Sequence, residues 1–165
     1  MMTRIDARDR LIVALDVPSA AEADALVARM GDQVRFVKVG LELYTVAGPD
    51  IVRKLVDRGK RVFLDLKFLD IEETVRRATA RVAAMGATFL TVHANRKALI
   101  AAVQGRGSSD LKLLAVTVLT NFDGEDLREM GIQRSVQDLV TARAMLAAEV
   151  GCDGVVASGE EPQAI

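Results

Sequence analysis

The sequence predicts an α/β fold built on a parallel β-sheet, and three observations favour this fold class. Short and almost continuously apolar runs alternate with longer amphipathic segments along the 165 residues. Such runs are typical of strands that are covered on both faces, as in parallel sheets. The glycines that end the predicted helices, Gly31, Gly59 and Gly86, lie 28 and 27 residues apart. That spacing suits a repeated strand–helix unit.

Six strands are expected at the apolar runs, which consist almost entirely of Val, Leu, Ile, Phe and Ala. They cover residues 11–15, 36–39, 62–66, 89–92, 113–119 and 154–157. A predicted helix separates each pair of neighbouring strands, and this alternation is the order that produces a parallel sheet. Residues 121–134, after the fifth strand, are expected to be irregular, and residues 160–165 are expected to open a sixth helix.

The first two predicted helices carry recognisable start and stop signals. Ser19 and Glu22 have the spacing of a capping box, and Gly31 ends the segment that they begin. Pro49 fits the first turn of the second helix, because proline lacks the N–H that this position leaves unpaired. We expect the second helix to stop at Gly59.

Three more helices follow along the chain. Asp70 is expected to cap the third helix, which ends at Gly86. Asn95 or a neighbour starts the fourth helix, which ends near residue 105 or 107. Ser135 begins the fifth helix, which has one apolar face and ends before Gly151.

Charge and composition argue against several classes of protein. The formal charge is −1, whereas proteins that bind nucleic acids or anionic membranes usually carry a basic excess. No run of about 18 apolar residues occurs, so no membrane span is expected, and residues 1–10 lack the apolar stretch of a secretory signal. Cys152 is the single cysteine, which favours a reducing, cytoplasmic location. The length suits a single domain over residues 1–165.

Charged and polar side chains stand near the carboxyl ends of the predicted strands, where ligand sites lie in α/β sheets and barrels. Asp65 and Lys67 are two residues apart, so on a regular strand both side chains share one face. Lys38 lies one strand earlier and Asp70 follows directly, so alternating charges can pair and stay ionised despite partial burial. The full set is Asp16, Lys38, Asp65, Lys67, Asp70, His93, Thr117 and Thr120.

Simpler explanations exist for these residues when each is taken alone. Asp70 fits a helix N-cap without any other role. A Lys–Asp pair at a strand end is often structural, and a lone histidine such as His93 is more often a satisfied polar residue than a ligand or a base. The sequence contains no glycine-rich phosphate loop and no cluster with convincing metal-ligand spacing.

The motif Asp65-x-Lys67-x-x-Asp70-Ile71-x-x-Thr74 resembles the signature of the orotidine 5′-monophosphate decarboxylase family. The resemblance implies a TIM-type (β/α)8 barrel, of which this chain contains about six βα units. It also implies decarboxylation of orotidine 5′-monophosphate to uridine 5′-monophosphate in de novo pyrimidine synthesis, without a cofactor or a metal. Five further segments are similar to strands of that family in the same order: residues 13–16, 36–40, 91–94, 116–120 and 154–158.

Matched by position, the resemblance implies roles for the charged cluster. Lys67 would stabilise the carbanion that develops at C6 of the pyrimidine and would then protonate it. Asp65 would lie beside the substrate carboxylate and orient Lys67. Lys38 would bridge Asp65 and a ribose hydroxyl, and Asp16 would bind the ribose.

The resemblance also implies contacts outside that cluster. His93 would line the pocket, and Thr120 would contact the edge of the pyrimidine. Asp70, Ile71 and Thr74 would act across the interface of a homodimer, in the partner's site. The only other partner implied is the small-molecule nucleotide.

Two alternative functions stay open from the sequence. Magnesium-dependent sugar-phosphate decarboxylases and aldolases of the same superfamily share the Asp-x-Lys-x-x-Asp motif, but they carry a glutamate where Lys38 stands. Lys38 therefore favours the metal-free orotidylate branch. The second alternative is a catalytically inactive, truncated barrel that acts as an assembly module.

The chain departs from the family pattern in two places and in length. Glu72 and Glu73 stand where the family usually has Pro-Asn, and Asn121 stands where a serine is common. A (β/α)8 barrel typically needs about 250 residues. The resemblance places the phosphate-binding loops after a seventh and an eighth strand, so little or no turnover is expected from the 165-residue chain alone.

Overall fold

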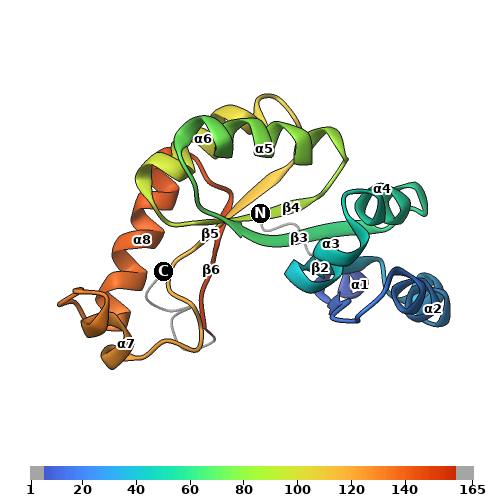
Figure 1. Cartoon of the computed structure of the whole chain (residues 1–165), viewed down its shortest axis with the longest axis horizontal. Coiled ribbons are helices and arrows are strands. Elements are labelled where there is room, and N and C mark those ends of the chain that lie inside the picture. The colour runs from blue at the N-terminus through green and yellow to red at the C-terminus, as the bar shows by residue number, and fades with distance from the viewer. Residues whose placement is uncertain (1–5, 159–165) are drawn as a thin grey trace. The chain divides into compact units, whose positions relative to one another are not determined.

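The structure is a computed structural model that describes residues 6–158 of the chain. Strands and helices alternate along these residues (Figure 1). The chain forms two compact units. The first comprises the described residues up to Leu66 together with Arg81–Leu90, and the second comprises Lys67–Ala80 together with the described residues from Thr91 onward.

The first unit contains three parallel strands and the helices that connect them. Strand β1 pairs with β2, and β2 pairs with β3, so that Ala14 lies opposite Lys38, and Gly40 lies opposite Asp65. This register brings the carboxyl ends of all three strands to the same edge. The elements are α1 (Ala7–Arg10), β1 (Ile12–Ala14), α2 (Ala20–Met30), η1 (Gly31–Gln33), β2 (Phe36–Gly40), α3 (Leu41–Ala47) and α4 (Asp50–Asp57).

Three elements have residues in both units, and the remaining elements belong to the second unit. Strand order follows chain order from β1 to β6, and β5 runs parallel to β6. The shared elements are β3 (Arg61–Phe68), α5 (Glu72–Ala84) and β4 (Phe89–His93). The second unit adds α6 (Arg96–Arg106), β5 (Lys112–Val116), α7 (Gly124–Glu129), α8 (Val136–Val150) and β6 (Gly154–Val156).

Buried apolar residues come from strand runs in the first unit and from a strand run and two helices in the second. In the first unit the rings of Phe36 and Phe89 stack with centroids 5.1 Å apart, beside the fully buried Val37, Val62 and Leu64. An aromatic pair of this kind contributes about 0.5–1.5 kcal/mol beyond its buried area. In the second unit, four buried residues anchor α7 and α8: Val118, Leu127, Leu139 and Val140.

Three of the side-chain caps predicted from the sequence are confirmed. The side chains of Ser19 and Ser135 accept hydrogen bonds from the backbone N–H three residues later, and Asn95 caps α6. Gly107 and not Gly105 ends that helix, with φ of 56°. A Cβ on Gly105 would lie 2.2 Å from the carbonyl oxygen of Arg76 on α5, so Gly105 is required by close helix packing.

The structure corrects several expectations about the elements. Helices α1, α3 and α7 were not predicted, and α7 falls within the stretch 121–134 that was expected to be irregular. Strand β5 ends at Val116 rather than at residue 119, although the N–H and the hydroxyl of Thr117 still donate to the carbonyl of Val156 on β6. Residues 160–165, expected to open another helix, lie outside the described residues.

Asp70 is not the residue that immediately precedes α5, as the capping hypothesis required. The helix begins at Glu72, so Ile71 stands at the boundary. The carboxylate of Asp70 accepts the backbone N–H of Ile71 at 2.6 Å. Its hydrogen bond therefore orders the turn before the helix. Across residues 6–158, no helix combines the length and the apolar character that crossing a bilayer requires.

Candidate active site

Three charged side chains meet at the carboxyl ends of the strands in the first unit. The ammonium of Lys38 lies 3.1 Å from a carboxylate oxygen of Asp16 and 3.9 Å from one of Asp65. The parallel register explains the meeting, because Lys38 on β2 lies between the end of β1 and the Asp65 position of β3. The predicted proximity of Lys38 and Asp65 is therefore present, and Asp16 joins this pair.

Burial distinguishes this cluster from an ordinary surface ion pair. The side chains of Lys38 and Asp65 are only 23% and 16% exposed, while Asp16 is 61% exposed. Partial removal from water strengthens electrostatic interactions, and the two carboxylates balance the ammonium charge. A Cβ on Gly40 would lie 3.4 Å from Asp16 and 3.5 Å from Lys38, so the missing side chain keeps the space beside the pair open.

Lys67 follows Asp65 by two residues on β3 and has an unusual backbone. Its φ is +50°, the left-handed region that a residue with a Cβ occupies at a cost of about 1–2 kcal/mol. Its N–H donates to the hydroxyl of the buried Thr91 at 2.9 Å, which helps to hold this conformation. Strained backbone of this kind clusters at functional sites. Since Lys67 departs from an extended strand, its shared face with Asp65 remains a prediction.

The residues expected at a dimer interface lie just after β3 in the second unit. Ile71 is 71% exposed, and Asp70 and Thr74 are exposed as well. The two glutamates that depart from the family pattern pair with cations on helices. Glu73 forms two hydrogen bonds with Arg76 at 2.7 and 2.8 Å, and Glu72 lies 3.2 Å from Lys97.

His93 lines a cavity of about 280 Å³ at the carboxyl ends of β4 and β5. Burial lowers the pKa of His93, and the positive charges of Arg143 and Lys67 lower it further. The imidazole is therefore neutral near pH 7, able to donate one hydrogen bond and to accept another. Thr117 lines the same cavity. Thr120 is exposed on the following loop, outside that lining.

Arg143 is a residue of this cavity that the sequence reasoning did not identify. Its guanidinium donates a hydrogen bond to the carbonyl oxygen of Thr117, and burial lowers its pKa. A signal was present, because Arg143 stands three residues after Val140 and four before Ala147, both buried on α8. A single charge within an apolar helical face indicates a polar target beneath it.

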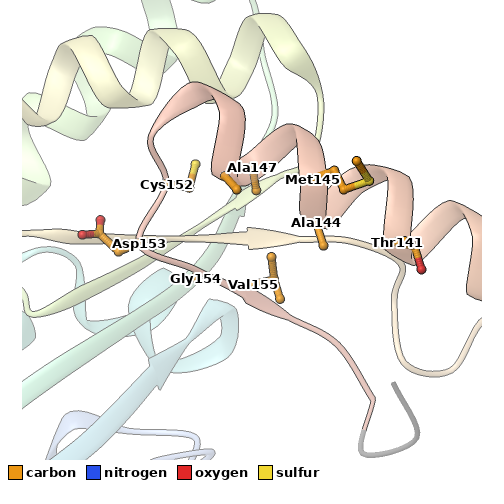
Figure 2. A pocket seen from close by; sticks show the side chains of 9 residues that line it. Thr141, Ala144, Met145, Ala147, Cys152, Asp153, Gly154 and Val155 are labelled. Atoms are coloured by element: carbon orange, nitrogen blue, oxygen red, sulfur yellow. The ribbon is translucent and has the colours of Figure 1, made fainter. Parts of the chain in front are cut away.

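A second cavity, of about 300 Å³, lies between α8 and β6 (Figure 2). Its side chains are mostly apolar, and it includes the half-buried Cys152. Burial is the main cause that raises the pKa of this thiol to about 11, so the sulfur is protonated and a poor nucleophile near neutral pH. Within residues 6–158, no three side chains of His, Cys, Asp or Glu are grouped as a metal ion requires.

Comparison with known proteins identifies the family. Residues 9–165 match the family described as orotidine 5′-phosphate decarboxylase / HUMPS. The orotidine 5′-phosphate decarboxylase of Nitrobacter winogradskyi is 56% identical over 155 residues, which are 94% of this chain and 65% of that protein. The one from Bradyrhizobium diazoefficiens is 50% identical over 158 residues, 96% of this chain and 67% of the relative. The chain thus spans about two thirds of the length of these curated relatives.

Solved structures agree with the sequence relatives. An orotidine 5′-phosphate decarboxylase from Lactobacillus acidophilus superposes with a TM-score of 0.85 at 38% identity, covering 92% of this chain and 72% of that one. An uncharacterized conserved protein from Geobacillus kaustophilus gives 0.87 at 41% identity, covering 92% and 75%. The fold is therefore the α/β fold of the TIM-barrel type, with six strands among the described residues. The family match, the sequence relatives and the solved structures agree that the chain belongs to the orotidine 5′-phosphate decarboxylase / HUMPS family.

Proposed function

We propose that the chain provides the catalytic centre of an orotidine 5′-phosphate decarboxylase, which converts orotidine 5′-monophosphate to uridine 5′-monophosphate and carbon dioxide. The observation that carries the proposal is the part-buried ammonium of Lys38 between Asp16 and Asp65, with Lys67 two residues farther along β3. Two relatives that are orotidine 5′-phosphate decarboxylases support it, at 56% and 50% identity.

The reaction calls for a fixed cation more than for a cofactor. The bond between C6 of the pyrimidine and the carboxylate breaks, carbon dioxide leaves, and the electron pair stays on C6 without a conjugated sink. In the proposal, the Lys67 ammonium stabilises this carbanion and then transfers a proton to C6. A preorganised charge acting in a site that excludes water is usually the largest single contribution to catalysis.

The carboxylates have a separate role in the proposal. Asp65 lies beside the substrate carboxylate and orients Lys67, so charge repulsion is relieved when carbon dioxide departs. Lys38 bridges Asp65 and a ribose hydroxyl, and Asp16 binds the ribose. The 3.1 and 3.9 Å contacts of Lys38 support this bridging role. Two flanking carboxylates favour the charged form of a lysine.

The second unit supplies the remaining contacts that we propose. His93 lines the nucleotide pocket, and its neutral state keeps a further positive charge away from that region. Thr120 contacts the pyrimidine edge. Asp70, Ile71 and Thr74 reach the partner's site in a homodimer, a role supported by the exposure of Ile71. A cytoplasmic location completes the proposal and is supported by the free thiol of Cys152.

The test compares the chain with a longer form, because its curated relatives are longer. We expect little turnover of orotidine 5′-monophosphate by the 165-residue chain. Joined to the part of the Nitrobacter protein that it does not match, the chain is expected to release carbon dioxide at a rate that Lys67→Ala abolishes. The fusion should work equally well with EDTA and with Mg²⁺. A folded fusion without activity, activity that survives Lys67→Ala, or a Mg²⁺ requirement would overturn the proposal.

A further inference from the structure

A charged cavity of about 430 Å³ lies at the amino ends of β2 and β3, within the first unit. Arg35 stands directly before β2, and Lys60 stands directly before β3. The cavity is thus at the opposite ends of these strands from Lys38 and Asp65. Its walls are formed by Arg8, Asp32, Arg35, Arg58, Gly59 and Lys60.

The walls of this cavity, which we call the amino-end cavity, carry an excess of positive charge. Four lining residues are cations, and Asp32 is the single carboxylate among the lining residues that the structure describes. Lys60 directs its ammonium to two backbone carbonyls, of Gly31 at 2.6 Å and Val34 at 2.8 Å. Those contacts satisfy hydrogen bonds without neutralising the charge, so the potential of the cavity stays positive.

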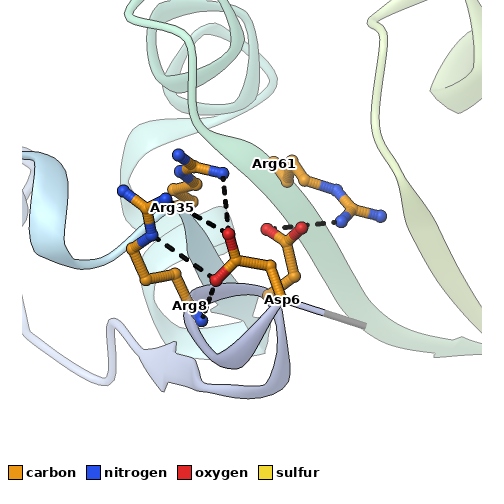
Figure 3. A network of polar contacts seen from close by, with 5 residues as sticks. Asp6, Arg8, Arg35 and Arg61 are labelled. Carbon is orange, nitrogen blue, oxygen red and sulfur yellow. Dashed lines mark hydrogen bonds and ion pairs between the residues drawn. The ribbon is translucent and has the colours of Figure 1, made fainter. Parts of the chain in front are cut away.

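Carboxylates around the rim offset part of this charge. Arg8 lies 3.1 Å and Arg35 3.9 Å from Asp6, and Arg61 lies 3.7 Å from Asp9 (Figure 3). The contacts of Arg35 and Arg61 attach α1 to the strands, whereas Arg8 and Asp6 pair within the first turn of α1.

Arg58 lies 3.0 Å from Asp24 on α2, a carboxylate that Lys54 also contacts. Counting Asp6, Asp24 and Asp32 against the four lining cations leaves an excess of one positive charge. Attachment of α1 therefore does not account for the cations on the far wall of the cavity. This excess of positive charge favours an anionic ligand.

We propose that the amino-end cavity binds a diphosphate group, at a site separate from the reaction centre. Guanidinium groups recognise phosphate oxygens with paired hydrogen bonds, and an ammonium adds a point charge. A cavity of about 430 Å³ has room for more than one phosphate. The proposal does not rest on the decarboxylase function, since none of these lining residues takes part in the proposed chemistry.

Calorimetric titration of the full chain with pyrophosphate at low ionic strength tests the proposal. We expect saturable binding at one site, weakened about tenfold or more in Arg35→Gln/Lys60→Met, because two charge-assisted contacts are lost. ADP in place of pyrophosphate distinguishes a nucleotide ligand from the free anion, and binding of either supports the site. Amide NMR shifts should be centred on Gly59 and Lys60.

Two control variants keep the test decisive. Arg96→Gln/Lys97→Gln removes the same formal charge from α6, where both residues pair with glutamates, and should leave affinity unchanged. Asp32→Asn removes the carboxylate of the wall and should tighten binding severalfold, a gain that misfolding cannot imitate. Absence of saturable binding of both probes, equal loss in the α6 variant, or shifts centred on Lys38 and Gly40 would overturn the proposal without touching the proposed decarboxylase function.

Discussion

The two ends of strands β2 and β3 use charge in opposite ways. At the carboxyl ends one part-buried cation, Lys38, lies between two carboxylates. At the amino ends, four cations line one cavity with a single carboxylate on its wall. The first arrangement holds one more carboxylate than cations and is the site that we propose for the chemistry, whereas the second has an excess of cations that we propose a ligand offsets. The strand register therefore gives the charged residues at the two ends of these strands different partners.

The largest effect is expected from removing the proposed catalytic cation. In the fusion with the unmatched part of the Nitrobacter protein, Lys67→Ala should lower kcat by about 10³-fold or more, since lost electrostatic stabilisation of the transition state has effects of this size. Lys60→Ala, at the amino ends, should change kcat less than about twofold. Steady-state decarboxylation assays measure both, and similar losses in the two variants would contradict the functional contrast between the strand ends.

Replacing one lysine at each strand end should lower the free energy of unfolding by different amounts. Lys38→Met leaves the carboxylates of Asp16 and Asp65 without their shared cation, at an expected cost of about 1–3 kcal/mol. Lys60→Met loses hydrogen bonds to two carbonyls but also relieves repulsion among cations, so we expect about 1 kcal/mol or less. Urea denaturation gives both values. A larger cost for Lys60→Met would reverse the comparison.

A glycine should relieve the strain next to the carboxyl-end cluster. The φ of +50° at Lys67 is unfavourable for any residue with a Cβ and unstrained for glycine. Lys67→Gly should therefore be more stable than Lys67→Ala by about 1 kcal/mol. The alanine variant is the matched control because it also lacks the ammonium. Equal urea midpoints for the two variants would show that the backbone conformation is not strained.

The smallest effect concerns pH and the imidazole near the β4 end. The pKa of His93 is lowered in the folded state, so the unfolded chain takes up a proton first as the pH falls. His93 therefore costs no stability above its unfolded pKa of about 6.5, and stability declines as the pH drops from there toward the folded value. Between pH 5 and 7.5, the melting temperature of the chain relative to that of His93→Gln should rise with pH and then level off. A pH dependence that is unchanged in His93→Gln would exclude this residue as its source.

Much of the fold could be predicted from local sequence patterns. The helices that were not predicted were missed for local reasons. Apolar runs and caps such as Ser19 and Asn95 predicted all six strands and five helices, because neighbours along the chain create those signals. Helix α3 was missed since it follows β2 directly and is preceded by Gly40, which has no side chain to cap it. Helix α7 was missed although Asp123 and Asp126 form a capping box, since only six residues follow the cap.

The sequence by itself determined the order of strands and helices and the family motif, because period and spacing along the chain encode both, and it predicted that Lys38 and Asp65 lie close together. Only the tertiary structure decided the left-handed backbone of Lys67, which depends on the hydroxyl of Thr91 on another strand. The same is true of the amino-end cavity. Its cations come from segments more than fifty residues apart along the chain, and only strand pairing brings such distant side chains into one electrostatic environment.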